Sequence, residues 1–141
     1  MREFVKWEKQ YHYPHMRDFE IELIEKYIEK FPDAYDRVAY SYPVGHGAPS
    51  NPIVNDETGG SDEYLYFKKI DMLCKKGNTT EIIEVKKKAG ASAIGQVKGY
   101  KDLLELDEVN TKVSQCVILT NETNSDLEIM AQKAGVKIIV V

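Results

Sequence analysis

The sequence has few cysteines and no long apolar run, and each absence excludes a class of protein. Only Cys74 and Cys116 occur in 141 residues, and neither belongs to a C-x-x-C or Cys/His spacing typical of zinc sites. We expect two reduced thiols in the core and a reducing compartment. No hydrophobic stretch approaches the length of a membrane-spanning helix, and the N-terminal MREFVKWEKQ is charged where a signal peptide is apolar. We therefore expect a cytoplasmic protein with no membrane partner.

Positive charge is not in excess either. The formal net charge of -4 argues against a protein that coats nucleic acid through bulk electrostatics. Local binding stays open, because Lys86, Lys87 and Lys88 are consecutive and Lys98 follows soon after. Such a basic strip could grip phosphates, or it could be a solvated strand end.

The composition is that of an ordinary globular protein, with 43% hydrophobic and 30% charged residues. A chain of this length can hold one core without disulfides. The chain has no internal repeat and no low-complexity tract. We expect a single domain over residues 1–141, with an N-terminal extension over about residues 1–15.

Apolar periodicity predicts a mixed α/β domain with the element order αβββαβαβ. Helices are expected at residues 16–31, 92–106 and 126–134, the second with Ser92 as its N-cap and the third closed by Gly135. Strands are expected at residues 35–44, 64–75, 80–87, 113–120 and 136–141. The second and third strands would form a hairpin. Residues 45–63 have no periodicity, so we expect a functional or mobile loop there.

Three charged residues of the predicted hairpin form the candidate site. Asp71 lies in the second strand, and Glu84 and Lys86 lie two apart in the third, so they share one face while Ile83 and Val85 occupy the other. Burying a carboxylate and an ammonium in a central strand costs on the order of several kcal/mol unless a metal or substrate compensates. Paired carboxylates suit a hard divalent cation such as Mg²⁺. Phosphodiester hydrolysis uses such an ion together with a nearby ammonium.

The first predicted helix adds Glu20 as a candidate. At helical spacing, Glu20 lies at the centre of an apolar arc formed by Met16, Leu23, Ile24, Tyr27 and Phe31. A glutamate in that position should point inward, where a carboxylate needs a partner. The alternative is a glutamate at the helix end that reaches solvent or pairs with a lysine.

The pattern resembles the PD-(D/E)XK nuclease superfamily, especially its RecB-like and resolvase-like branches. Asp71 is followed by Glu84-Val85-Lys86 as the E-x-K, and Gln96 and Tyr100 in GQVKGY resemble the family's Q-x3-Y element. The resemblance covers roughly residues 16–120. It implies a restriction-endonuclease-like αβββαβ core, with a central mixed β-sheet flanked by helices.

The resemblance also implies roles for the site residues. Asp71 and Glu84 would bind Mg²⁺ or Mn²⁺, the Val85 carbonyl would add an oxygen ligand, and Glu20 would hold metal or water. Lys86 would serve the attacking water. Two residues, Gln96 and Tyr100, would orient the lysine or contact the phosphate backbone.

We therefore expect a metal-dependent DNA endonuclease, with a homodimer or a partner protein supplying specificity. The alternatives are an RNA-cutting nuclease and a non-catalytic nucleic-acid-binding or assembly module on the same fold. Lys87, Lys88, Lys98, Tyr100 and His46 are the candidate nucleic-acid contacts, although a solvated histidine is the favoured interpretation of His46. The N-terminal aromatic residues could stack on bases. Packing against the domain is the favoured interpretation for these: Trp7, Tyr11 and Tyr13.

Overall fold

The computed structural model describes residues 3–45 and 68–141. Its strands are β1 (Val5–Lys6), β2 (Arg37–Val44), β3 (Lys68–Lys76), β4 (Thr79–Lys86), β5 (Gln115–Thr120) and β6 (Val136–Val140). Its helices are α1 (Asp18–Lys30), α4 (Ala91–Asp107) and α5 (Ser125–Ala134). The predicted loop over residues 45–63 lies outside the described residues, apart from Gly45.

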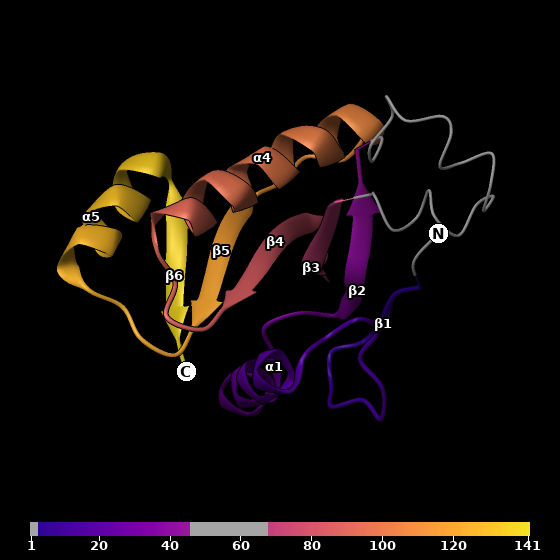
Figure 1. The fold of residues 1–141 in the computed structure, drawn as a ribbon. Coiled ribbons are helices and arrows are strands. Elements are labelled where there is room, and N and C mark those ends of the chain that lie inside the picture. Colours follow the sequence, from indigo (N-terminus) through magenta and orange to yellow (C-terminus); the bar gives the residue numbers. More distant parts are fainter. Residues whose placement is uncertain (1–2, 46–67) are drawn as a thin grey trace, which may run out of the picture.

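All six strands form one mixed sheet in the order β1-β2-β3-β4-β5-β6. Neighbouring strands from β1 to β4 are antiparallel. β4, β5 and β6 run parallel, because α4 connects β4 to β5 and α5 connects β5 to β6. Figure 1 shows α1 on one side of the sheet and α4 and α5 on the other. The predicted fold class, a mixed sheet flanked by helices in αβββαβ order, is confirmed.

Each face of the sheet has its own apolar layer, because side chains alternate between the two faces along a strand. The layer beneath α1 includes Ile24, Tyr27, Met72, Ile83 and Val85. The layer beneath α4 and α5 includes Ile82, Val97, Leu104, Ile118 and Leu127. Strand β4 contributes to both layers, and it is a central strand because it pairs with β3 on one side and β5 on the other.

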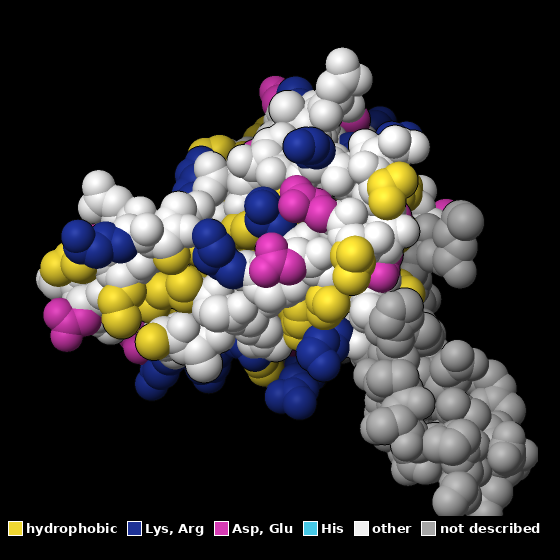
Figure 2. All heavy atoms as spheres, turned by 90° about the horizontal axis from the view of Figure 1, so that it is seen from above, with side chains coloured by type: hydrophobic (Ala, Val, Ile, Leu, Met, Phe, Trp, Pro, Cys, Tyr) yellow, Lys and Arg dark blue, Asp and Glu magenta, His cyan; other side chains and the backbone are white. Residues whose placement is uncertain are grey.

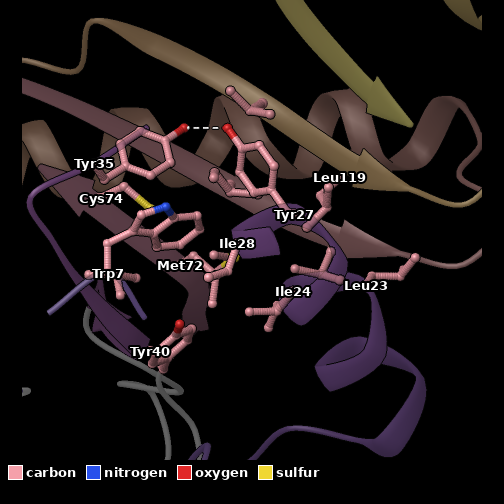
Figure 3. Packing of buried hydrophobic residues seen from close by; sticks show 14 of the residues in the cluster. Trp7, Leu23, Ile24, Tyr27, Ile28, Tyr35, Tyr40, Met72, Cys74 and Leu119 are labelled. Carbon is pink, nitrogen blue, oxygen red and sulfur yellow. Dashed lines mark hydrogen bonds between the residues drawn. The ribbon is translucent and has the colours of Figure 1, made fainter. Parts of the chain in front are cut away.

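The N-terminal segment is part of this packing. Trp7 is 4% exposed, its ring makes edge contacts with Tyr27 and Tyr35, and its Nε1 donates to the Phe31 carbonyl at 2.9 Å. Figure 3 shows Trp7 among the residues of the α1 layer. Tyr13 is also buried, whereas Tyr11 is fully exposed. The prediction that these aromatic residues pack against the domain is confirmed for Trp7 and Tyr13 and is wrong for Tyr11.

Several local predictions differ from the structure. Ser92 is not the N-cap of α4: Gly90 holds that position and Ser92 lies in the first turn. Helix α1 begins at Asp18 and not at residue 16, because the preceding Arg17 is extended. Strand β1 was not predicted, since two residues are too few for a periodic pattern.

Both cysteines are buried and free, as the sequence predicts. No helix in the described ranges has the length and apolar character needed to span a membrane.

Candidate active site

Strands β3 and β4 separate at the level of Asp71. They pair from Lys76 and Thr79 up to Met72 and Ile83. Beyond that point, the Val85 N–H donates to the Asp71 Oδ2 at 2.8 Å. The Asp71 side chain thus accepts the hydrogen bond of the Val85 amide, where the strand backbones no longer pair. This contact holds the carboxylate against β4.

The opposite side of Asp71 is irregular as well. β2 and β3 pair at Tyr40 with Met72 and at Tyr42 with Ile70, and Ser41 lies between these pairs with φ of 51°. The Ser41 Oγ donates to the Pro14 carbonyl at 2.6 Å, which ties this bend to the N-terminal segment. Asp71 therefore lies where the sheet is disturbed on both sides, a frequent property of functional sites.

Glu84 is the buried member of the site. Its side chain is 3% exposed, and its Oε2 lies 3.6 Å from the Nζ of Lys86, which is 42% exposed. The Glu84 Oε1 is buried without a hydrogen-bond donor among the residues that the structure describes. Ile83 and Val85 point into the α1 layer. The predicted geometry, with Glu84 and Lys86 on one face, is therefore present.

The two carboxyl groups influence each other's protonation. Burial raises the pKa of Glu84, and the nearby Asp71 raises it further. Burial also raises the pKa of Asp71, against the lowering effect of the Val85 N–H. A charge on Asp71 disfavours a second charge on the buried Glu84, so the two carboxyl groups titrate as a pair. Without a cation, the pair therefore favours one charge over two.

Helix α4 places two polar side chains beside this pair. The Gln96 Nε2 donates to the Tyr100 hydroxyl at 2.8 Å, one helical turn away. The pKa of Tyr100 is raised by burial and, to a lesser degree, by the charges of Glu84 and Asp71. The charges of the two carboxylates thus reach Tyr100, and the roles that the resemblance implies for Gln96 and Tyr100 stay predictions.

Glu20 lies at the start of α1, where its Oε1 accepts a hydrogen bond from the Arg17 N–H at 2.8 Å. This is the capping position of a glutamate at a helix end. Its charge makes a small contribution to the raised pKa of Asp71. No group of three or more His, Cys, Asp or Glu side chains within residues 3–45 and 68–141 is arranged to hold a metal. A metal-binding role for Glu20 stays a prediction.

Residues 61–141 match a family model described as the endonuclease NucS C-terminal domain. This segment is more than half of the chain. The chain belongs to this family. The matched segment includes Asp71, Glu84, Lys86, Gln96 and Tyr100, whereas Glu20 lies outside it.

Two solved structures are similar to this member of the NucS C-terminal domain family. One is a repair endonuclease from Pyrococcus abyssi, with a TM-score of 0.59 and 15% identity over 94% of this chain and 49% of that chain. The other is an EndoMS–dsDNA complex, with a TM-score of 0.50 and 15% identity over 94% of this chain and 48% of that chain. The chain spans about half the length of both proteins. Similarity at this level of identity shows the fold alone. No curated protein matches the chain in sequence.

Basic residues occupy several surfaces of this NucS-family domain. Lys87 and Lys88 are exposed in the turn that follows β4. Lys98 extends from α4 toward α5, where its Nζ donates to the Ala134 carbonyl at 2.8 Å. Figure 2 shows basic and acidic side chains interspersed on the face formed by α4 and α5. His46 lies outside the described residues.

The sequence analysis missed Thr120 and Asn121. Thr120 is the last residue of β5, which lies parallel to β4, and Asn121 follows it. Their side chains accept hydrogen bonds from the turn that follows β4. A signal was available, since the carboxyl ends of neighbouring parallel strands meet at one edge of a sheet. Ser41 was also missed, and no sequence pattern marks it.

Proposed function

We propose that this domain is a metal-dependent DNA endonuclease of the PD-(D/E)XK type. The observation that carries the proposal is the buried carboxylate of Glu84, which lies beside a second carboxylate and a half-exposed lysine. Membership of the NucS C-terminal domain family supports nuclease activity. Similarity to an EndoMS–dsDNA complex supports DNA as the substrate.

The residues present suit a hard divalent cation. Asp71 and Glu84 supply carboxylate oxygens, and the Glu84 Oε1 lacks a hydrogen-bond donor among the described residues, as expected for an oxygen that serves as a ligand. The Val85 carbonyl and Glu20 are the further candidate ligands. When bound, Mg²⁺ or Mn²⁺ would lower the pKa of water and neutralise charge on the phosphate.

The chain's own residues divide the remaining work. Lys86 is anchored by Glu84 and open to solvent, so its ammonium can orient the attacking water or stabilise charge that develops on the phosphate. Gln96 and Tyr100, which bond to each other beside the carboxylates, can hold Lys86 or the phosphate backbone in place. Lys87 and Lys88, which are exposed in the turn after β4, would contact phosphates next to the cleaved bond.

The test is cleavage of circular and linear, single- and double-stranded DNA and RNA, with Mn²⁺ or with EDTA. We expect Mn²⁺-dependent cutting of circular DNA, and we expect Glu84→Gln to abolish it. The matched control is Glu128→Gln, the same substitution at an exposed position on α5. If the parent binds DNA but cuts no substrate with Mn²⁺, the non-catalytic binding module replaces the nuclease. Preferential cutting of RNA would overturn the proposal that DNA is the substrate.

A further inference from the structure

The chain leaves β4 through a short turn. Side chains at the end of β5 accept hydrogen bonds from two backbone amides of this turn. The Lys88 N–H donates to the Asn121 Oδ1 at 2.8 Å, and the Ala89 N–H donates to the Thr120 Oγ1 at 3.2 Å. Thr120 is fully buried and pairs with Lys86 across the two strands. The anchoring side chains therefore meet the turn directly beside the last residue of β4.

Lys88 adopts a backbone conformation that lysine disfavours. Its φ is 50°, in the left-handed region, where the Cβ of a non-glycine residue crowds the backbone. Such a conformation persists only when surrounding contacts impose it. The hydrogen bond to Asn121 is one such contact. Without it, we expect Lys88 to relax to negative φ and redirect the chain as it leaves β4.

We propose that Asn121 is a positioning residue for the catalytic lysine. By holding Lys88 in the left-handed conformation, Asn121 fixes the path of the turn and thereby the position of Lys86 beside Glu84. This inference rests on the proposed function, in which Lys86 acts on the attacking water. The Asn121 side chain holds the Lys88 amide, so it acts on Lys86 through the turn.

The test is a double-mutant cycle on DNA cleavage, measured at saturating DNA with Mn²⁺. We expect Asn121→Ala to slow cleavage roughly three- to tenfold, the factor expected from the loss of one neutral hydrogen bond. Binding of DNA with Ca²⁺ should change less. In a Lys88→Gly background the same substitution should have little effect, because glycine adopts positive φ without an anchor. Asn121→Asp keeps the acceptor oxygen and should retain most of the rate.

A second asparagine provides the matched control. The Asn124 Oδ1 accepts a hydrogen bond from the Leu127 N–H at 2.9 Å and caps α5, so Asn124→Ala also removes one side-chain contact to a backbone amide. Both alanine variants should lower the melting temperature, but only Asn121→Ala should lower the cleavage rate. If the two variants cut equally well, or if the effects of Asn121→Ala and Lys88→Gly simply add, the positioning role is overturned. A parent that cuts no DNA would overturn the proposed function itself, a result distinct from either of these.

Discussion

Glu84 is an acidic residue on a central strand, between two apolar neighbours that lie fully inside the α1 layer. An isolated carboxylate in such a place costs on the order of several kcal/mol. Lys86 on the solvent side offsets part of that cost, and the raised pKa of Glu84 lets the carboxyl keep its proton and avoid part of the rest. A bound cation would remove the remaining cost. Glu84 therefore lowers the stability of the metal-free fold while it serves the proposed function.

We expect Glu84→Gln to raise the melting temperature at pH 7 in EDTA. In the unfolded chain Glu84 loses its proton near its ordinary pKa of about 4.3. In the folded protein burial raises that pKa, so the native state binds more protons and the free energy of unfolding falls as the pH rises. Glutamine cannot titrate. The gain should be on the order of 1–3 kcal/mol, because a tenfold difference in proton affinity corresponds to about 1.4 kcal/mol.

Calorimetric melting of both proteins between pH 3 and pH 8 checks this. The difference should vanish below about pH 4, where the carboxyl is protonated in both the folded and the unfolded states. The exposed Glu128→Gln variant should melt like the parent at every pH. A Glu84→Gln variant that melts below the parent at pH 7 would show that the ionised pair stabilises the fold.

Lys86→Ala should separate binding from cleavage. The substitution leaves both carboxylates in place but removes the ammonium near the reacting phosphate. We expect the single-turnover cleavage rate to fall roughly 10²–10³-fold, the loss typical of one transition-state donor. Calorimetric Mn²⁺ affinity and DNA binding with Ca²⁺ should persist. Lys87→Ala is the control, and it should weaken DNA binding more than the rate. Equal cleavage by Lys86→Ala and the parent would refute the assignment.

Among the elements, the connection from α5 to β6 depends on a single backbone conformation. Gly135 has φ of 75° at the C-terminus of α5, and its N–H bonds to the last helical carbonyls. A left-handed residue lets the chain turn directly from the helix into the strand. The carboxyl edge of the sheet depends on this connection, because β6 pairs with β5, which in turn pairs with β4.

Two glycine substitutions should therefore have effects of opposite sign. Gly135→Ala should destabilise the fold by about 1 kcal/mol, because alanine disfavours positive φ. Gly95→Ala, inside α4, should stabilise it by about 0.5–1 kcal/mol, because alanine favours the helix. An added Cβ would contact no atom within 4 Å at either position, so the backbone alone decides the sign. Urea denaturation measures both effects, and a stabilised Gly135→Ala variant would contradict this account.

At the scale of the whole molecule, the net charge does not describe the charges at the candidate site. The chain is acidic overall, yet its candidate site combines two carboxylates with consecutive lysines at the end of β4. A divalent cation would neutralise the carboxylates and leave the lysines free to contact phosphates. Binding of the cation, folding and binding of DNA should therefore be coupled.

We expect Mn²⁺ to release protons as it binds at pH 7. The raised pKa of Glu84 means that the pair retains a proton that a cation must displace. Titration calorimetry in two buffers of different ionisation enthalpy measures the number released. At a hundred times its Kd, the cation should add about 2.7 kcal/mol to the free energy of unfolding. Identical heats in both buffers would contradict the retained proton, and Glu84→Gln should abolish the buffer dependence.

The sequence by itself determined the fold class, the β3–β4 hairpin and the shared face of Glu84 and Lys86. Each follows from local periodicity and turn chemistry, which need no knowledge of distant partners. Helix starts were predicted less well. Ser92 has a suitable side chain for an N-cap, but Gly90 is the N-cap and α4 begins at Ala91, directly after the anchored turn.

Only the tertiary structure decided how the site is held together. Three hydrogen bonds between residues far apart in the sequence hold it. They join Val85 to Asp71, Ser41 to Pro14 and Lys88 to Asn121. Such contacts depend on which strands become neighbours and in which register. β4 and β5, for example, are joined along the chain by α4 and pair in parallel, and no local pattern in the sequence encodes the register of that pairing.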